Sequence, residues 1–384
     1  MSGPADPVTG GAGEDAGGAR GGAPGGPPAP PADASPPPGP VSRVRALARA
    51  AGVPRLVIGF FLVVLFAIAV ATRMDVPGLL TDSLARIARN GLLVLALLPA
   101  IRGGLGLNFG LPLGIVCGLT GCVVSLNAGM KGWAGLGAAA LIGLLLSIPV
   151  GWGYGAILNR TRGQEMMVGT YLGFAAVSGM SIFWLLAPFH NPQLVWALGG
   201  IGLRTTLSLS GAYDKLLDRF LAFEIAGISV PTGTLLLFAG FCALTALFFR
   251  TRWGITIAAA RANPRFARAA GISYTATRTQ AAILSTALGA LGIVVFAQSY
   301  GFVQLYTAPL YMAFPAVACL LIGGATVSNA TVLHVIVGTV LFQSILTVAL
   351  PVTSQVVQGD ISETARLVIQ NGMILYALTR REKR

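Results

Sequence analysis

The chain has 384 residues, of which 54% are hydrophobic and only 10% are charged, whereas an ordinary soluble domain carries about 25% charged residues. This composition indicates an all-α polytopic membrane protein and excludes a soluble globular one. The net charge of +13 comes largely from arginines beside apolar runs, which the positive-inside rule explains without a nucleic-acid partner. All thirteen acidic residues lie in tails, in loops or at the ends of apolar runs, so a mechanism with a buried proton-carrying carboxylate loses support.

The N-terminal segment, residues 1–42, is dominated by Gly, Pro and Ala and carries no aromatic residue. Such a segment buries too little apolar surface to offset its ordering entropy, so we expect a disordered tail. The first apolar run begins near Pro54 and is long enough to span a membrane, so it is interpreted as a transmembrane helix and not as a signal peptide. Residues 43–384 form the predicted transmembrane domain.

Ten apolar runs approach the roughly 20 residues that a membrane span needs. They cover residues 54–72, 85–101, 108–126, 134–158, 166–187, 234–249, 281–299, 306–325, 331–350 and 362–379. If the N-terminus is cytoplasmic, ten spans place the arginine-rich segments 43–55, 160–162, 250–280 and 380–384 in the cytoplasm. The loop 188–233, in which acids and bases nearly balance, then lies outside. Both termini are therefore predicted to be cytoplasmic.

The region 99–112 interrupts apolar sequence with two prolines, four glycines, Arg102 and Asn108. Helices in lipid tolerate this density of Gly and Pro only where the backbone is buried in protein or lines a water-filled path. The pattern predicts two helices that meet at a non-helical crossover, and a plain cytoplasmic turn is the alternative. In the first interpretation the freed backbone faces a translocation path. The candidate path residues are Gly103, Gly104, Asn108 and Gly110 here, and Gln298 and Tyr300 in a later span.

A short, well-capped helix is predicted in the stretch RANPRFARAAGI, within the basic loop of residues 250–280. Asn263 suits the N-cap, Pro264 the first helical position and Gly271 the position just past the end, which gives a helix over 264–270. Phe266 shares one face with two alanines, and two arginines share another. A helix this short is marginal alone, so we expect it to pack against another body, with anionic lipid as the alternative.

Nothing in the sequence indicates an enzyme. The two histidines are isolated, and no nucleophile, base and orienting group converge in sequence. The four cysteines lie in apolar runs without a CxxC spacing and are interpreted as core residues, not as metal ligands. None of the three lysines lies in a phosphate-binding G-x-x-x-x-G-K-[ST] loop, so this chain cannot be an ATPase.

The stretch 251–291 resembles the cytoplasmic loop of ABC-importer permeases that serve ribose, galactose, other simple sugars and nucleosides, a branch related to branched-chain amino acid permeases. The family pattern T-x-x-G-x-x-x-R-A-x-G-x-N-P-x-A-A-x-x-A-G-I is matched in order by Thr251, Gly254, Ala262, Asn263, Pro264, Ala267, Ala270, Gly271 and Ile272. The segments GGLGLNFGLPLG, GQEMMVGTYLGF and ACLLIGGATV are similar to three further family segments. Together they touch most of residues 85–380.

The resemblance implies a multi-pass permease of the bacterial cytoplasmic (inner) membrane that works with ATPase subunits, a second permease and an extracytoplasmic solute-binding protein. The partner ATPase uses ATP and Mg, and this chain binds no cofactor. In the family the loop helix docks in a groove of the ATPase and passes its motion to the spans. The ATPase-coupling residues implied here are Arg261, Asn263, Pro264, Arg265, Phe266, Ala267, Arg268, Ala270 and Gly271.

Two other functions are compatible with the residues themselves. An ion-coupled secondary transporter is suggested by the broken helix, because interrupted spans often build ion and solute sites. A membrane scaffold is suggested only by the N-terminal tail and the basic loops. The identity of the solute, and whether the second permease is the same chain, are not encoded in any motif.

Overall fold

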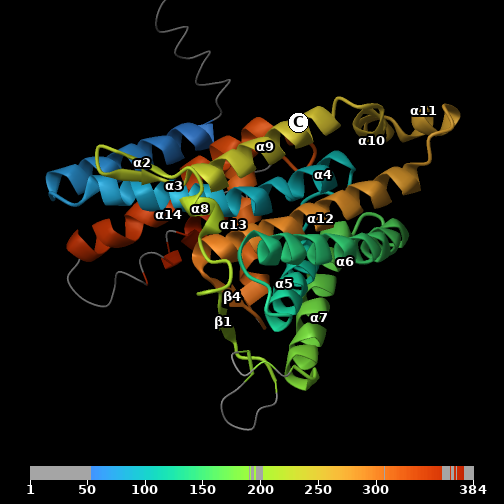
Figure 1. The fold of residues 1–384 in the computed structure, drawn as a ribbon. Coiled ribbons are helices and arrows are strands. Elements are labelled where there is room, and N and C mark those ends of the chain that lie inside the picture. Colours follow the sequence, from blue (N-terminus) through green and yellow to red (C-terminus); the bar gives the residue numbers. More distant parts are fainter. Residues whose placement is uncertain are drawn as a thin grey trace, which may run out of the picture. The chain divides into compact units, whose positions relative to one another are not determined.

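The computed structural model describes residues 53–189, 191, 194–195, 202–306, 308–356, 364, 367–368 and 370–375, which all belong to one compact unit, Ala48–Arg384. This part of the chain is mostly helical (Figure 1). The predicted tail 1–42 and half of the tenth apolar run, 362–379, lie outside the described residues.

The long helices follow the predicted apolar runs from 54–72 to 331–350 in order. They are α2 (Val53–Ala71), α3 (Val76–Leu95) continued by α4 (Leu97–Arg102), α5 (Leu111–Asn127), α6 (Gly132–Arg160), α7 (Glu165–Leu186), α9 (Thr232–Phe248), α12 (Tyr274–Tyr300), α13 (Ala308–Ile322) and α14 (Val332–Val356). Three short helices complete the set: α8 (Leu216–Arg219), α10 (Arg252–Ala262) and α11 (Pro264–Ala269).

Five helical segments in the described residues are long and apolar enough to cross a membrane: 76–102, 132–160, 165–186, 274–300 and 332–355. A sixth arises if α9 and α10, which are bent by 67°, form one span. Apolar helices over 55–71, 111–127 and 308–322 are shorter. The fold is therefore that of a polytopic membrane protein.

One acidic residue lies differently from the prediction. The structure begins the second long helix at Val76, well before the predicted run 85–101, so Asp82 lies inside α3 and not in a loop. Asp75 caps this helix, because its carboxylate accepts a hydrogen bond from the Gly78 amide at 3.1 Å. Pro77 and Gly78 in the first turn, followed by the polar residues 81–83, hide the true helix start from a search for apolar residues alone.

Four short strands in the described residues depart from the purely helical prediction; three lie within the loop 188–233 and one follows α12. Strand β1 (Thr206–Ser208) pairs antiparallel with β4 (Phe302–Gln304), with Leu207 opposite Val303. Strands β2 (Phe223–Ile225) and β3 (Ile228–Val230) form a hairpin. Its two turn residues, Ala226 and Gly227, have φ of 52° and 79°, as expected for the tight turns that match strand twist.

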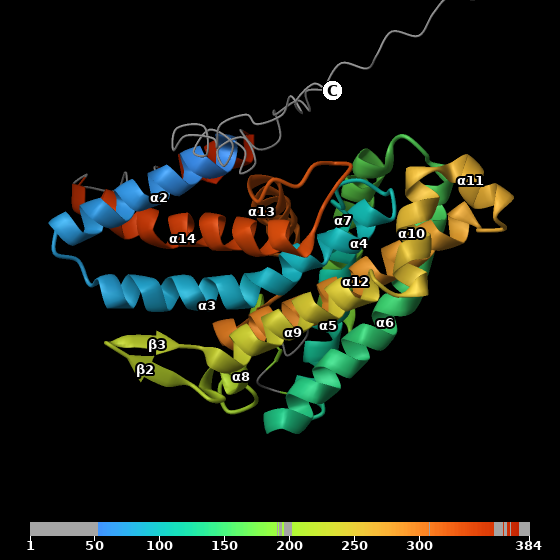
Figure 2. The ribbon, with the colours of Figure 1, turned by 90° about the horizontal axis from the view of Figure 1, so that it is seen from above.

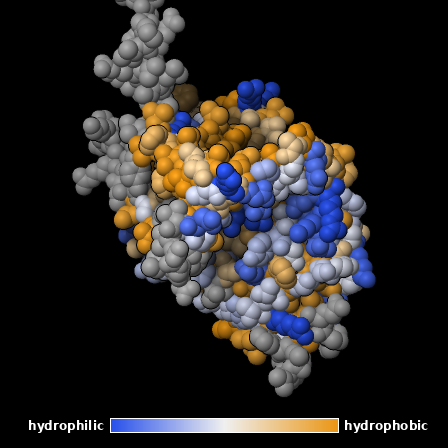
Figure 3. Space-filling view, turned by 90° about the vertical axis from the view of Figure 1, so that its left-hand side faces the viewer, coloured by the Kyte–Doolittle hydropathy of each residue, from blue (hydrophilic) through white to orange (hydrophobic). Residues whose placement is uncertain are grey.

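Helices α3 and α12 run through the middle of the unit, whereas α6 and α7 lie along one side (Figure 2). In the apolar windows of α3–α4 and α12, 72% of the residues are buried, against 17% in α7. Helices α10 and α11 lie at one end of the bundle, which we call the α11 end, and the β2–β3 hairpin lies at the opposite end. Viewed from the side that carries the α2–α3 turn, hydrophilic and hydrophobic residues occupy separate areas (Figure 3).

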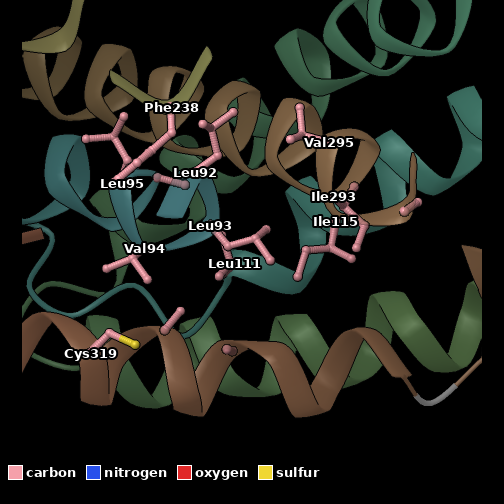
Figure 4. Close-up of a cluster of buried hydrophobic side chains, with 14 of the residues drawn as sticks. Leu92, Leu93, Val94, Leu95, Leu111, Ile115, Phe238, Ile293, Val295 and Cys319 are labelled. Atoms are coloured by element: carbon pink, nitrogen blue, oxygen red, sulfur yellow. The ribbon is translucent and has the colours of Figure 1, made fainter. Parts of the chain in front are cut away.

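The core is formed where α3, α5, α9 and α12 meet (Figure 4). Leu92, Leu93 and Leu95 of α3 are fully buried there, as is Ile115 of α5. Glycines allow the helix axes to approach closely, as small residues do in membranes. A Cβ on Gly114 of α5, for example, would lie 2.5 Å from the backbone oxygen of Thr286 in α12.

Candidate functional site

In the loop 250–280, the coupling loop of the family resemblance, the predicted short helix forms as α11. A helix that was not predicted, α10, precedes it and meets it at Asn263. The Asn263 side chain accepts a hydrogen bond from the Phe266 amide at 3.0 Å, and Pro264 is the first residue of α11. Gly271 follows with φ of +74°, a conformation that favours glycine. The helix ends at Ala269, one residue before the predicted end.

Helix α11 contacts its own chain through one small residue. Ala267 is fully buried, whereas the Phe266 residue is 65% exposed. Arg265, Arg268 and Ala270 are exposed as well. Helix α11 therefore presents an aromatic side chain and two cations outward.

Two arginines hold the coupling loop and the end of α4 to the turn between α13 and α14. Arg261 donates a hydrogen bond to the backbone oxygen of Ser328. Arg102 donates to the backbone oxygen of Ala330 at 3.0 Å, and its guanidinium lies 4.8 Å from the ring centroid of Phe249. The turn between α13 and α14, which contains Gly323 and Gly324, is thus part of the α11 end, directly beside the coupling loop.

The predicted non-helical crossover spans residues 103–110, between α4 and α5. It begins at the α11 end, because a Cβ on Gly104 (φ +76°) would lie 3.3 Å from the Arg261 side chain. A groove of about 680 Å³ opens here, lined by Gly104, Leu105, Gly106, Gly163, Gln164, Glu165, Met166, Met167, Arg261 and Val327. Gly104 is therefore a predicted path residue of the crossover that borders this groove.

The other crossover candidates are packed inside the protein. Asn108 is buried, and its amide donates a hydrogen bond to the Ser285 hydroxyl of α12 at 2.8 Å. Its side-chain oxygen accepts hydrogen bonds from the Tyr154 hydroxyl at 2.7 Å and from the Gly110 amide at 2.9 Å. In this conformation Asn108 ties the crossover to α6 and α12.

Gly103 and Gly110 sit where no larger residue fits. A Cβ on Gly103 would overlap the methyl group of Ala281, and one on Gly110 would lie 2.5 Å from the ring of Tyr154. Both glycines therefore permit close packing. Asn108, Gly103 and Gly110 form one contact region, and Gly104 lies at its open edge.

The two predicted path residues of α12 have different surroundings. Gln298 is fully buried, and its side-chain oxygen accepts a hydrogen bond from the Leu217 amide at 3.2 Å, which fastens the loop around α8. Tyr300 instead borders a cavity of about 220 Å³ between α3, α12, α13 and α14. The cavity is lined by Arg86, Arg89, Asn90, Leu93, Val94, Phe296, Tyr300, Gln304, Tyr311, Met312, Pro315, Ala316, Gln343 and Leu346.

Arg86, Arg89 and Asn90 of this cavity were not among the predicted site residues. A signal for them exists in the sequence, because the run 85–101 contains two arginines three residues apart. Ionisable residues inside a membrane segment usually face the interior of the bundle or a polar cavity. Here Arg86 and Arg89 both line the cavity inside the bundle.

Helices of membrane-spanning length, a capped helix at one end and a polar cavity inside the bundle together define a polytopic membrane protein. The protein family described as branched-chain amino acid transport system / permease component matches residues 79–378. The chain belongs to this family of ABC-transporter permeases. It is therefore a multi-pass transport subunit that implies a separate ATPase partner. No curated protein and no solved structure shows a significant match to the chain.

Proposed function

We propose that this chain is the permease of an ATP-driven importer that moves a small hydrophilic solute, a simple sugar or a nucleoside, into a bacterial cell. The family match supports the permease role, and the resemblance of the coupling loop to sugar and nucleoside permeases supports the solute class. The arginines at the α11 end suit a cytoplasmic location under the positive-inside rule. On this proposal ten spans cross the inner membrane, and both termini are cytoplasmic.

The observation that carries the proposal is the exposed face of α11. Phe266 is a large apolar side chain that is 65% exposed, on a helix whose caps fix its backbone. Aromatic side chains flanked by arginines are the usual anchors of protein interfaces. We propose that Phe266 enters a groove of the ATPase, that Arg265 and Arg268 meet acidic groups at its rim, and that ATP and Mg bind in that partner.

The attachments of the coupling loop provide a route for motion. The loop leads directly into α12, which is central and well buried, and Arg261 joins it to the turn at Ser328. A displacement of α11 therefore reaches α12 and the α13–α14 turn together. We further propose that a second permease, identical or paralogous, completes the path, and that a solute-binding protein delivers the solute outside.

The test is co-purification of the tagged protein with the ATPase encoded beside it. Phe266→Ala should weaken the complex roughly thirtyfold, since an interface anchor contributes about 2 kcal/mol. Phe60→Ala is the matched control, because Phe60 of α2 is 71% exposed, far along the chain from the coupling loop. Undiminished ATPase recovery and ATP hydrolysis with Phe266→Asp would exclude this coupling role.

An ion-coupled secondary transporter is the second candidate, because the crossover 103–110 interrupts the helices as such sites often do. The family match favours the ATP-driven permease. Solute uptake into vesicles that contain this chain alone, driven by an ion gradient, would reverse that preference.

A further inference from the structure

The 220 Å³ cavity reaches the middle of two of the spans that border it, those of α3 and α14. Arg89 follows the start of the span Val76–Arg102 by thirteen residues and precedes its end by thirteen. Gln343 lies eleven residues from the start of the span 332–355 and twelve from its end. Polar side chains at this depth are costly in lipid and usually mark a solute path. The cavity therefore extends from the middle of α3 and α14 to the end of α12, where Phe296, Tyr300 and Gln304 line it.

Arg89 has unused hydrogen-bonding capacity in this cavity. Its guanidinium lies 5.6 Å from the ring centroid of Tyr300 and 5.9 Å from that of Phe296, and these two rings stack on each other at 5.5 Å. Among the described residues no carboxylate lies within ion-pair distance of Arg89. Its buried Nε atom has no hydrogen-bond partner there. A guanidinium carries five N–H donors, so Arg89 can bind oxygen atoms of a guest.

The remaining polar lining consists of the Arg86 guanidinium, amides and phenols, and no carboxylate borders the cavity. The Asn90 amide donates one hydrogen bond to the backbone oxygen of Arg86 at 2.9 Å, and the Gln343 amide donates one to the Cys319 sulfur at 3.8 Å. An amide NH2 has two N–H donors, so each of them keeps one donor as well as its oxygen acceptor. A hydroxyl group both donates and accepts, so it pairs with an amide in either direction. The Phe296–Tyr300 stack adds an apolar wall for the face of a ring. Because both aromatic faces already stabilise the Arg89 charge, the guest need not supply a negative charge.

Access to the cavity runs past two tyrosines. Tyr311 is 74% exposed and Tyr300 is 41% exposed, and both line the cavity. The volume of about 220 Å³ equals that of roughly seven liquid waters, which suits a single hydroxylated ring. The site is therefore reachable and of the size of one small solute.

We propose that this cavity binds the transported solute, that the solute is a neutral hydroxylated ring such as a monosaccharide or the sugar of a nucleoside, and that Arg89 donates hydrogen bonds to its oxygen atoms. This inference rests on the proposed function, and it places solute recognition between α3, α12, α13 and α14. It assigns specificity to Arg89, Asn90 and Gln343.

The first test is import by the complete transporter in proteoliposomes, with labelled D-ribose, D-galactose and adenosine as probes. Arg89→Met should raise the KM for import at least tenfold, the effect of losing a hydrogen bond to a charged donor, and should still co-purify with the ATPase. Arg73→Met is the matched control, because Arg73 is exposed in the turn between α2 and α3. An unchanged KM in Arg89→Met, or a preference for D-galacturonate over D-galactose, overturns the proposal.

A second measurement needs neither ATPase nor transport. The four native cysteines are buried, so a cysteine introduced by Tyr311→Cys is the preferred target of a thiol reagent. D-Galactose should slow its labelling, and Arg89→Met should remove that protection. Equal labelling rates with and without D-galactose, D-ribose and adenosine contradict the site. If the wild type shows no ATP-driven import but protection persists, the proposed function fails and the cavity assignment stands.

Discussion

Arg278 donates a hydrogen bond to the Glu165 carboxylate at 2.7 Å, in an ion pair whose side chains are only 3% and 16% exposed. The same guanidinium donates to the backbone oxygen of Leu158 at 3.3 Å and to the Tyr274 hydroxyl at 3.3 Å. Arg278 thereby joins the first turns of α12 to the end of α6 and the start of α7. The segment that leaves the coupling loop is fixed to the α6–α7 pair.

Removing one partner of this pair should destabilise the protein strongly. Arg278→Met leaves the Glu165 charge poorly compensated, and the loss of one member of a buried pair costs about 3–5 kcal/mol. The double variant Arg278→Met/Glu165→Met should recover part of this loss, because no charge then remains unpaired.

The buried cysteines provide the measurement for this prediction, since a thiol-reactive dye reports unfolding only when Cys117, Cys122, Cys242 or Cys319 becomes exposed. Arg219→Met is the control: Arg219 is 72% exposed and lies 3.8 Å from Asp214, and such surface pairs contribute little. Equal unfolding temperatures for the two single variants would contradict the role of the buried pair.

The N-cap of α11 should matter for coupling more than for overall stability. Asn263→Ala removes the acceptor of the Phe266 amide and should cost about 1 kcal/mol of local helix stability. Because α11 is short and peripheral, we expect weaker ATPase association with a nearly unchanged unfolding temperature. Asn263→Asp and Asn263→Ser retain a capping oxygen and should restore association. If neither variant associates with the ATPase more tightly than Asn263→Ala does, loss of the cap is not the reason for the weaker association.

The contact between α13 and α14 should not tolerate a methyl group. A Cβ on Gly338 of α14 would overlap the backbone oxygen of Cys319 in α13, whereas nothing lies within 4 Å of one on Gly137 in α6. Gly338→Ala should therefore lower the unfolding temperature through overpacking, which typically costs about 1–3 kcal/mol. Gly137→Ala should be neutral or slightly stabilising, since alanine favours a helix interior. Indistinguishable melting curves would disprove the tight contact.

The hydroxyl of Tyr154 should stabilise the crossover modestly. Tyr154→Phe removes one hydrogen bond to Asn108, and a bond of this kind contributes about 1 kcal/mol. Tyr171→Phe is the control, because Tyr171 of α7 is exposed. Thermal unfolding of the purified variants compares the two. A Tyr154→Phe protein as stable as the control would mean that Asn108 does not depend on this contact.

Local signals in the sequence predicted much of the fold. Apolar runs located the long helices, and cap preferences located α11 to within one residue, because both depend on neighbours along the chain. The resemblance of residues 251–291 to ABC-importer permeases agreed with the family match at the level of ABC permeases. These features need no knowledge of tertiary contacts.

Long-range packing decided the features that the sequence did not predict. Whether Asn108 faces a path or another helix depends on Ser285, which lies 177 residues away. Gln298 and Tyr300 are only two residues apart in α12, yet one fastens a loop and the other borders a cavity. Arg89 became a site residue only when α12, α13 and α14 were placed around it.

The position of Arg86 and Arg89 in the middle of α3 has a consequence for the synthesis of this protein. An arginine at a helix centre costs about 2.5–3.5 kcal/mol during insertion, and the helices α12, α13 and α14 that shelter these two are made much later. The span that contains α3 is therefore synthesised before the helices that surround its two arginines. It should enter the bilayer poorly as an isolated segment, and should be held beside α2 or within the translocation machinery until the C-terminal helices arrive.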